Sequence, residues 1–99
     1  MYVLKLPRLV GSREAANEIV STLGDVDGQP VIVDCTDLVS GSVSFADELV
    51  RRLLEDLGAS KVEVVSASDE FWKYLSESAI EMGAGEKIEQ GGRGLLLAN

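Results

Sequence analysis

The residues of this chain that could do chemistry gather in one turn that holds three hydroxyl groups. Ser40, Ser42 and Ser44 occupy alternate positions in the run Ser-Gly-Ser-Val-Ser, between a predicted strand and a predicted helix. The first N–H groups of a helix have no partner inside the helix, so a hydroxyl here can cap the helix or lie beside an anion. Ser44 precedes Asp47 by three positions, which is the spacing of a capping box. We therefore expect Ser44 to be the cap.

A second turn offers a glycine, a hydroxyl and a guanidinium group. Gly11, Ser12 and Arg13 follow the first predicted strand and precede the first predicted helix. In a parallel sheet the turns that follow the strands lie at one edge, so we expect the two turns to lie side by side. Together they would form a surface that accepts an anion or a phosphate. The simpler alternative is that Ser12 or Gly11 starts the helix and that Arg13 is solvated.

The chain contains no histidine. This excludes Ser-His-Asp catalysis, Cys-His catalysis and histidine-ligated metal sites. The sequence also has no phosphate-binding glycine loop, dinucleotide fingerprint or calcium loop. Asp34 and Asp37 end a predicted strand, and we expect them to stabilise a turn rather than to bind a metal. We therefore predict a protein that is not an enzyme and that has no cofactor and no metal.

Composition restricts the partners and the location. The formal net charge is −8, from 17 acidic and 9 basic residues. That charge repels phosphate backbones, so we expect no nucleic-acid binding. The apolar runs are too short to span a membrane, and the first residues lack the pattern of a signal peptide. The single cysteine, Cys35, cannot form an internal disulfide, and we predict one cytoplasmic domain over residues 1–99.

Three strand–helix units are predicted along the chain. We expect strands at 2–6, 31–34 and 61–65, and helices from 12 to 23, from 45 to 57 and from about 68 to 82. Residues 84–94 should be irregular, and 95–97 could add a last strand. The consecutive apolar residues of 31–34 indicate that helices cover both faces of the sheet. The predicted fold class is an α/β layer fold of βαβαβα order with a small, mainly parallel sheet.

The second predicted helix is strongly amphipathic. Its apolar residues recur at steps of three and four and define one stripe: Phe45, Ala46, Leu49, Val50, Leu53, Leu54 and Leu57. Its other face carries four opposite-charge pairs spaced by four: Asp47/Arg51, Glu48/Arg52, Arg51/Glu55 and Arg52/Asp56. Gly58 tolerates the left-handed conformation that ends such a helix. By default the charged face is only a solvated face.

The segment from Val31 to Gly58, VIVDCTDLVSGSVSFADELVRRLLEDLG, resembles the core of a STAS domain, the fold of anti-sigma-factor antagonists. The form Ser-x-Ser-Phe-Ala-Asp-Glu-Leu, here Ser42–Leu49, is more similar to a bacterial STAS-like family whose function is not established. The run Val10-Gly11-Ser12-Arg13-Glu14-Ala15-Ala16 also matches the start of the first helix in that family. The two motifs and the order of elements span most of the chain.

The resemblance implies a docking surface and raises the question of a phosphorylation switch. In antagonist STAS domains the turn reads Asp-Ser-Ser-Gly, and a partner kinase phosphorylates the serine after the aspartate. Aligned without gaps, that position is Val43 in this chain. The usual switch is therefore excluded, and Ser42 and Ser44 stay as phospho-acceptor candidates. The resemblance also implies that the turn and the start of the second helix dock a partner, often a GHKL-type ATPase or kinase.

We therefore predict a non-catalytic regulatory module that binds a protein partner through 41–48, aided by Arg13. The candidate partner-binding or phospho-acceptor residues are Ser42, Ser44, Asp47 and Glu48. The alternative is a small-anion or nucleotide-binding domain that uses Gly11, Ser12, Arg13 and the start of the second helix. An enzyme that works through Ser44 or Asp47 is the least favoured class. A homo-oligomer is left open, because Trp72 and residues 95–97 could contribute to a dimer.

Overall fold

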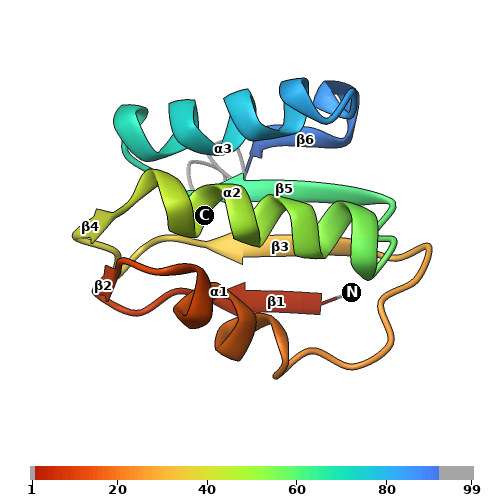
Figure 1. The fold of residues 1–99 in the computed structure, drawn as a ribbon, viewed down its shortest axis with the longest axis horizontal. Coiled ribbons are helices and arrows are strands. Elements are labelled where there is room, and N and C mark those ends of the chain that lie inside the picture. The colour runs from red at the N-terminus through yellow and green to blue at the C-terminus, as the bar shows by residue number, and fades with distance from the viewer. Residues whose placement is uncertain (1, 92–99) are drawn as a thin grey trace, which may run out of the picture.

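The computed structural model describes residues 2–91, which form a four-stranded sheet with three helices beside it (Figure 1). The strands lie in the order β1 (Tyr2–Lys5), β3 (Pro30–Asp34), β5 (Lys61–Val65) and β6 (Ile88–Gly91), and every neighbouring pair is parallel. The helices between them are α1 (Arg13–Val20), α2 (Val43–Arg51) and α3 (Asp69–Glu81). The predicted α/β class with a mainly parallel sheet is confirmed. The strand predicted at 95–97 lies outside the described residues.

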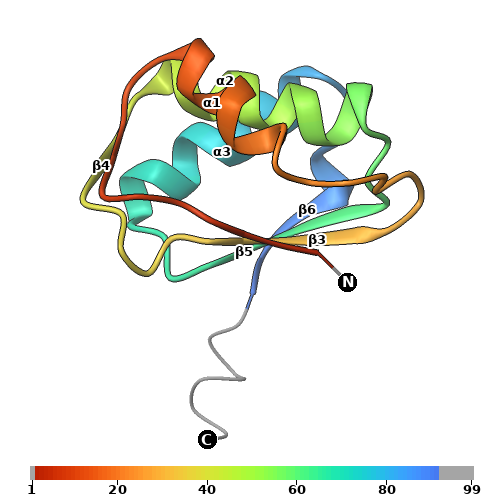
Figure 2. The same ribbon diagram turned by 90° about the horizontal axis from the view of Figure 1, so that it is seen from below.

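All three helices cover the same face of the sheet, as the edge-on view in Figure 2 shows. The expectation that helices cover both faces is therefore wrong. In β3, Val31 and Val33 are buried on the helix side, whereas Ile32 is only half-buried on the other side. Ile32 lies in register between Val3 of β1 and Glu63 of β5. On the face of the sheet opposite the helices, Ile32 thus has neighbours only in the adjacent strands. Val3 is 58% exposed on that face.

The core lies between the sheet and the helices. The apolar stripe predicted for the second helix is buried except at Leu57, which is only partly buried, and Phe45 and Leu49 are fully inaccessible to solvent. The ring of Phe45 packs against that of Phe71 in α3, with 6.3 Å between the ring centroids. Other core side chains come from both layers, among them Leu4, Val31, Val33, Val62 and Val64 from the sheet, and Ala16, Val20, Leu53, Leu75 and Ala79 from the helices. Burial of this apolar surface is the main term that stabilises the fold.

Several elements differ from the prediction at their ends. The helix that begins with α2 continues past Arg51 as a turn of π-helix, η1 (Arg52–Asp56), before Gly58 adopts φ +67°. A shorter helix than predicted, α1, ends at Val20. The stretch 84–94, expected to be irregular, contains a short 3₁₀ turn, η2 (Gly85–Lys87), and strand β6. No helix in residues 2–91 is long and apolar enough to cross a membrane.

Candidate functional site

The two turns that carry the candidate residues lie side by side and are joined by hydrogen bonds. Two short strands, β2 (Leu9–Val10) and β4 (Ser40–Gly41), form a parallel ladder of their own at one end of the molecule (Figure 1). Val39 N–H donates to the Arg8 carbonyl at 2.8 Å, and Ser42 N–H donates to the Val10 carbonyl at 3.0 Å. The sequence predicted the neighbourhood of the turns but not this ladder.

Gly41 allows this ladder to sit directly on the core. A Cβ atom at Gly41 would overlap the Phe71 ring, with Cδ1 only 2.8 Å away, and would lie 3.2 Å from Val10 Cγ2. Phe71 is only 2% exposed and cannot move into solvent cheaply. The glycine is therefore required by the close approach of the turn to Phe71.

Three large apolar side chains are exposed around this ladder. Leu9, Val39 and Val43 are 70%, 69% and 57% exposed. They are three of the five large hydrophobic residues exposed in the described part of the chain; the other two, Val3 and Ile80, lie elsewhere, on β1 and α3. We call the surface formed by Leu9–Val10 and by residues 39–43 the tip. It combines apolar side chains with serine hydroxyls at the start of α2.

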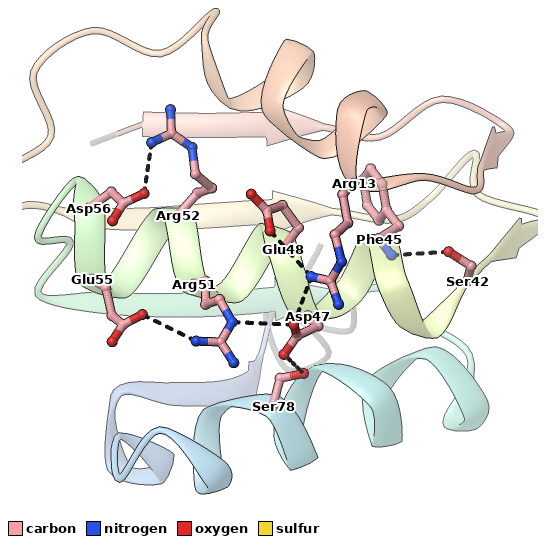
Figure 3. Close-up of polar contacts among 10 residues, drawn as sticks. All are labelled: Arg13, Ser42, Phe45, Asp47, Glu48, Arg51, Arg52, Glu55, Asp56 and Ser78. Atoms are coloured by element: carbon pink, nitrogen blue, oxygen red, sulfur yellow. Dashed lines mark hydrogen bonds and ion pairs between the residues drawn. The ribbon is translucent and has the colours of Figure 1, made fainter.

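Ser42, and not Ser44, caps α2. The Ser42 hydroxyl accepts a hydrogen bond from the Phe45 N–H at 3.0 Å, and Ser42 has the extended backbone of a cap residue (Figure 3). The expectation that Ser44 is the cap is wrong, because the helix begins one residue before Ser44. Ser44 is exposed and lies inside the first turn, and its hydroxyl forms no hydrogen bond within residues 2–91. Within residues 2–91, Ser44 is therefore free to react or to bind, and so is the exposed Ser40 hydroxyl in β4.

The first turn uses its polar groups inside the molecule. The Ser12 hydroxyl caps α1 by accepting from the Ala15 N–H at 3.1 Å. Arg13 Nη1 donates to Asp47 Oδ2 at 2.9 Å and to Glu48 Oε1 at 3.2 Å, across from α1 to α2 (Figure 3). These two carboxylates raise the pKa of Arg13, and the side chain is about half exposed. Gly11 is exposed, and a Cβ atom added there would meet nothing within 4 Å.

Asp47 joins all three helices. Its carboxylate accepts hydrogen bonds from Arg13 of α1, from Arg51 Nε within α2 at 3.2 Å, and from the Ser78 hydroxyl of α3 at 3.2 Å (Figure 3). Only 15% of the Asp47 side chain is exposed. The hydrogen bond from Arg13, followed by those from Arg51 and Ser78, holds the pKa of Asp47 below its ordinary value of 3.8. Asp47 is thus a structural carboxylate that stays ionised.

The charged face of α2 differs from the predicted pattern at one pair. Asp47/Arg51 and Arg51/Glu55 are present, at 3.2 and 3.6 Å, and Arg52 pairs with Asp56 at 2.8 Å. The expected Glu48/Arg52 pair does not form, because Glu48 pairs with Arg13 instead. The sequence-local rule cannot anticipate a partner that arrives from another helix.

A polar groove of about 390 Å³ runs between α2 and α3. Its residues on the α2 side include two site candidates, Ser44 and Asp47, together with Arg13 from α1. Sequence reasoning missed the α3 side, which is formed by Lys73, Tyr74, Glu77, Ser78 and Glu81. The four-residue spacing of Lys73, Glu77 and Glu81 signals one helix face. Nothing in the sequence says that this face borders the start of α2.

The remaining titratable candidates have structural partners. Asp34 accepts hydrogen bonds from the backbone N–H and the hydroxyl of Thr36, which confirms its turn-stabilising role and lowers its pKa. Asp37 pairs with Lys5 at 3.3 Å. Residues 2–91 contain no cluster of three or more carboxylate or cysteine side chains that could hold a metal ion. Cys35 is buried, and its burial raises the pKa of the thiol to about 12.

Comparison with known proteins adds no assignment. No family model, no curated protein and no solved structure matches this chain. The resemblance to STAS domains therefore stays a prediction from the motifs, and the function has to be argued from the site itself.

Proposed function

We propose that this protein is a non-catalytic, STAS-like regulatory module that binds a protein partner through the tip and the first turn of α2. The observation that carries the proposal is the gathering of Leu9, Val39 and Val43 around the β2–β4 ladder. Exposed apolar side chains on a hydrogen-bonded, preorganised surface favour protein association, because their burial stabilises a complex without prior ordering of the loop. The cytoplasmic location predicted from the sequence belongs to the same proposal.

The geometry favours this function over the alternative of a small-anion or nucleotide site. Such a site would use Ser12 and Arg13, but the Ser12 hydroxyl already caps α1 and the guanidinium of Arg13 already pairs with Asp47 and Glu48. An anion would have to displace two carboxylates from Arg13. The alternative predicts stabilisation by a nucleotide panel in a thermal-shift assay, whereas the docking function predicts none.

Ser44 is the residue through which a partner kinase would regulate docking. Its hydroxyl is exposed and free, while Ser42 is needed as the cap. A phosphate at Ser44 would lie in the first turn of α2, where the N–H groups favour an anion. It would also add about two negative charges beside Asp47 and Glu48, and repulsion at the interface would then separate modified from unmodified protein. A GHKL-type kinase is the partner class that the resemblance implies.

Docking at the tip is tested by placing a charge on the tip and, as a control, on an exposed apolar residue outside it. Val39→Asp places a charge on the tip, and Ile80→Asp places the same charge on α3, where Ile80 is 66% exposed. Affinity capture from the lysate of the source cell should retain the same partner on wild type and on Ile80→Asp, and lose it on Val39→Asp. Far-ultraviolet circular dichroism must show equal folding of all three proteins. Retention of that partner by Val39→Asp would refute docking at the tip.

A second variant tests regulation separately from docking. Ser44→Asp leaves the Ser42 cap intact and adds a negative charge to the first turn of α2. If the turn is a charge-sensitive switch, Ser44→Asp weakens capture of the partner that wild type retains, and Ser44→Asn does not. Equal capture by Ser44→Asp and wild type would keep the docking module and reject the switch at Ser44.

A further inference from the structure

Helices α2 and α3 run in the same direction (Figure 1), and side chains from both line the groove between them. Three residues at four-residue steps line it on each side: Val43, Asp47 and Arg51 on α2, and Lys73, Glu77 and Glu81 on α3. Residues at this spacing stack along one face of a helix. The groove therefore lies between two rows of side chains, and Val43, the first residue of the α2 row, also belongs to the tip.

The charges on the α3 side of the groove change sign along its length. Lys73 lies at the end near the start of α2, where Arg13 reaches in from α1 and Ser44 offers its hydroxyl. Glu77 and Glu81 follow toward the other end. None of the ion pairs formed within residues 2–91 involves Lys73, Glu77 or Glu81. Arg51 cannot neutralise the acidic end fully, because it is already paired with Asp47 and Glu55.

The unpaired charges are spaced for a partner segment rather than for a small molecule. The eight-residue step from Lys73 to Glu81 corresponds to about 12 Å along the axis of α3. Their side chains are exposed, so a small ligand would keep much of its surface in water and gain little from them. A peptide segment that lies along the groove can reach both ends, and Val43 and the partly buried Tyr74 give it apolar contact.

We propose that the α2–α3 groove binds a segment of the protein partner that carries a carboxylate opposite Lys73 and an ammonium or guanidinium group about one to two turns of α3 away, opposite Glu77 and Glu81. This proposal rests on the docking function and names the chemistry of the partner. The partner segment contacts the tip at Val43 and continues along α3. Its orientation is set by the reversal of charge along the groove.

Selection of peptides from a displayed random library on the purified protein tests this proposal. The enriched peptides should carry an acidic and a basic residue at a separation that matches one to two turns of α3, about 6–12 Å. Lys73→Glu, and separately Glu77→Lys combined with Glu81→Lys, should each weaken binding of these peptides by roughly threefold to tenfold. Reversal of the peptide charge that faces the substituted residue should restore the binding. Lys87→Glu and Glu86→Lys, at exposed positions outside the groove, are the controls and should change little.

The outcomes separate this proposal from the docking function. Enriched peptides without the charge pattern, or binding that ignores the groove variants, would overturn the groove as the site. If Val39→Asp still abolished the binding of such peptides, docking at the tip would be supported and the groove would be refuted. Peptides that depend on Lys73 and Glu81 but not on Val39 would support the groove, since Val39 does not line it, and docking at the tip would then be decided by partner capture on Val39→Asp. A failure to enrich any peptide would count against the groove.

Discussion

Arg13, at the start of α1, and Asp47, in the second turn of α2, lie 34 positions apart in the sequence and meet at 2.9 Å. The same carboxylate accepts the Ser78 hydroxyl of α3 at 3.2 Å. One side chain thus links the three helices that cover the sheet. Arg13, Asp47 and Ser78 all line the groove between α2 and α3, so the link also holds together the walls of the groove proposed to bind the partner.

Replacement of this carboxylate should change the dependence of stability on pH. Asp47→Asn removes the charge that Arg13 and Arg51 bind, and it should lower the free energy of unfolding at pH 7 by about 1 kcal/mol, because the arginine partners are half exposed. The pKa of Asp47 is depressed in the folded state, so its contribution is complete above the ordinary value of 3.8 and is lost as pH falls through the lower folded pKa.

The measurement is urea unfolding of wild type and Asp47→Asn from pH 7 down to the acid transition. The difference between the two proteins should be constant at neutral pH and shrink below about pH 4. Asp56→Asn, which breaks an exposed pair inside one helical segment, is the control and should differ from wild type by less than about 0.5 kcal/mol. A difference that grows on acidification would contradict the role assigned to Asp47.

Two serines in one turn should have unequal effects on stability. Ser42→Ala removes the cap of α2 and leaves the Phe45 N–H without its partner, which should cost about 1 kcal/mol. Ser44→Ala should be nearly neutral, because no hydrogen bond within residues 2–91 uses its hydroxyl. Thermal or urea unfolding of both variants measures this. Ser42→Asp, which keeps a capping oxygen, should stay close to wild type, and equal losses for the two alanine variants would refute the assignment of the cap.

The sequence predicts what depends on local pattern. The amphipathic stripe of α2, the left-handed Gly58 and the strand at Lys61–Val65 all follow from periodicity and residue type, and all are present. The prediction that helices cover both faces of the sheet was wrong, because a run of consecutive apolar residues at 31–34 does not specify what covers each face. A second helix layer would bury Ile32, but no helix of residues 2–91 covers its face of the sheet. Its neighbours on that face are Val3 of β1 and Glu63 of β5, and Ile32 is only half-buried.

The candidate site depends on contacts between distant segments, which local pattern does not encode. The partner of Glu48 comes from α1, and the far wall of the groove comes from α3. The cap was misplaced by two residues because Ser42 and Ser44 have the same chemistry, and only the backbone direction at Ser42 distinguishes them. The juxtaposition of the two turns was predictable, since parallel strands place their following turns at one edge.

Gly41 and Gly11 should respond differently to the same substitution. Gly41→Ala drives a methyl group into the Phe71 ring and Val10, so it should destabilise the protein by about 1–3 kcal/mol and displace the tip. Gly11→Ala is the matched control: nothing lies within 4 Å of the added Cβ, and the expected change is within about 0.5 kcal/mol. Urea unfolding gives both values. A neutral Gly41→Ala would show that the turn does not rest on Phe71 in solution.

The Cys35 thiol should not react with thiol reagents until the protein unfolds. The thiol is buried at the end of β3, and its pKa is raised to about 12, first by burial and then by the charge of Asp34. At pH 8 the thiolate population should therefore be lower than that of an ordinary cysteine by roughly a thousandfold. The rate of reaction with a disulfide reagent, with and without urea, measures this. Reagent should modify Cys35 only as fast as the protein opens, so rapid modification in native buffer would mean that the end of β3 is open to solvent.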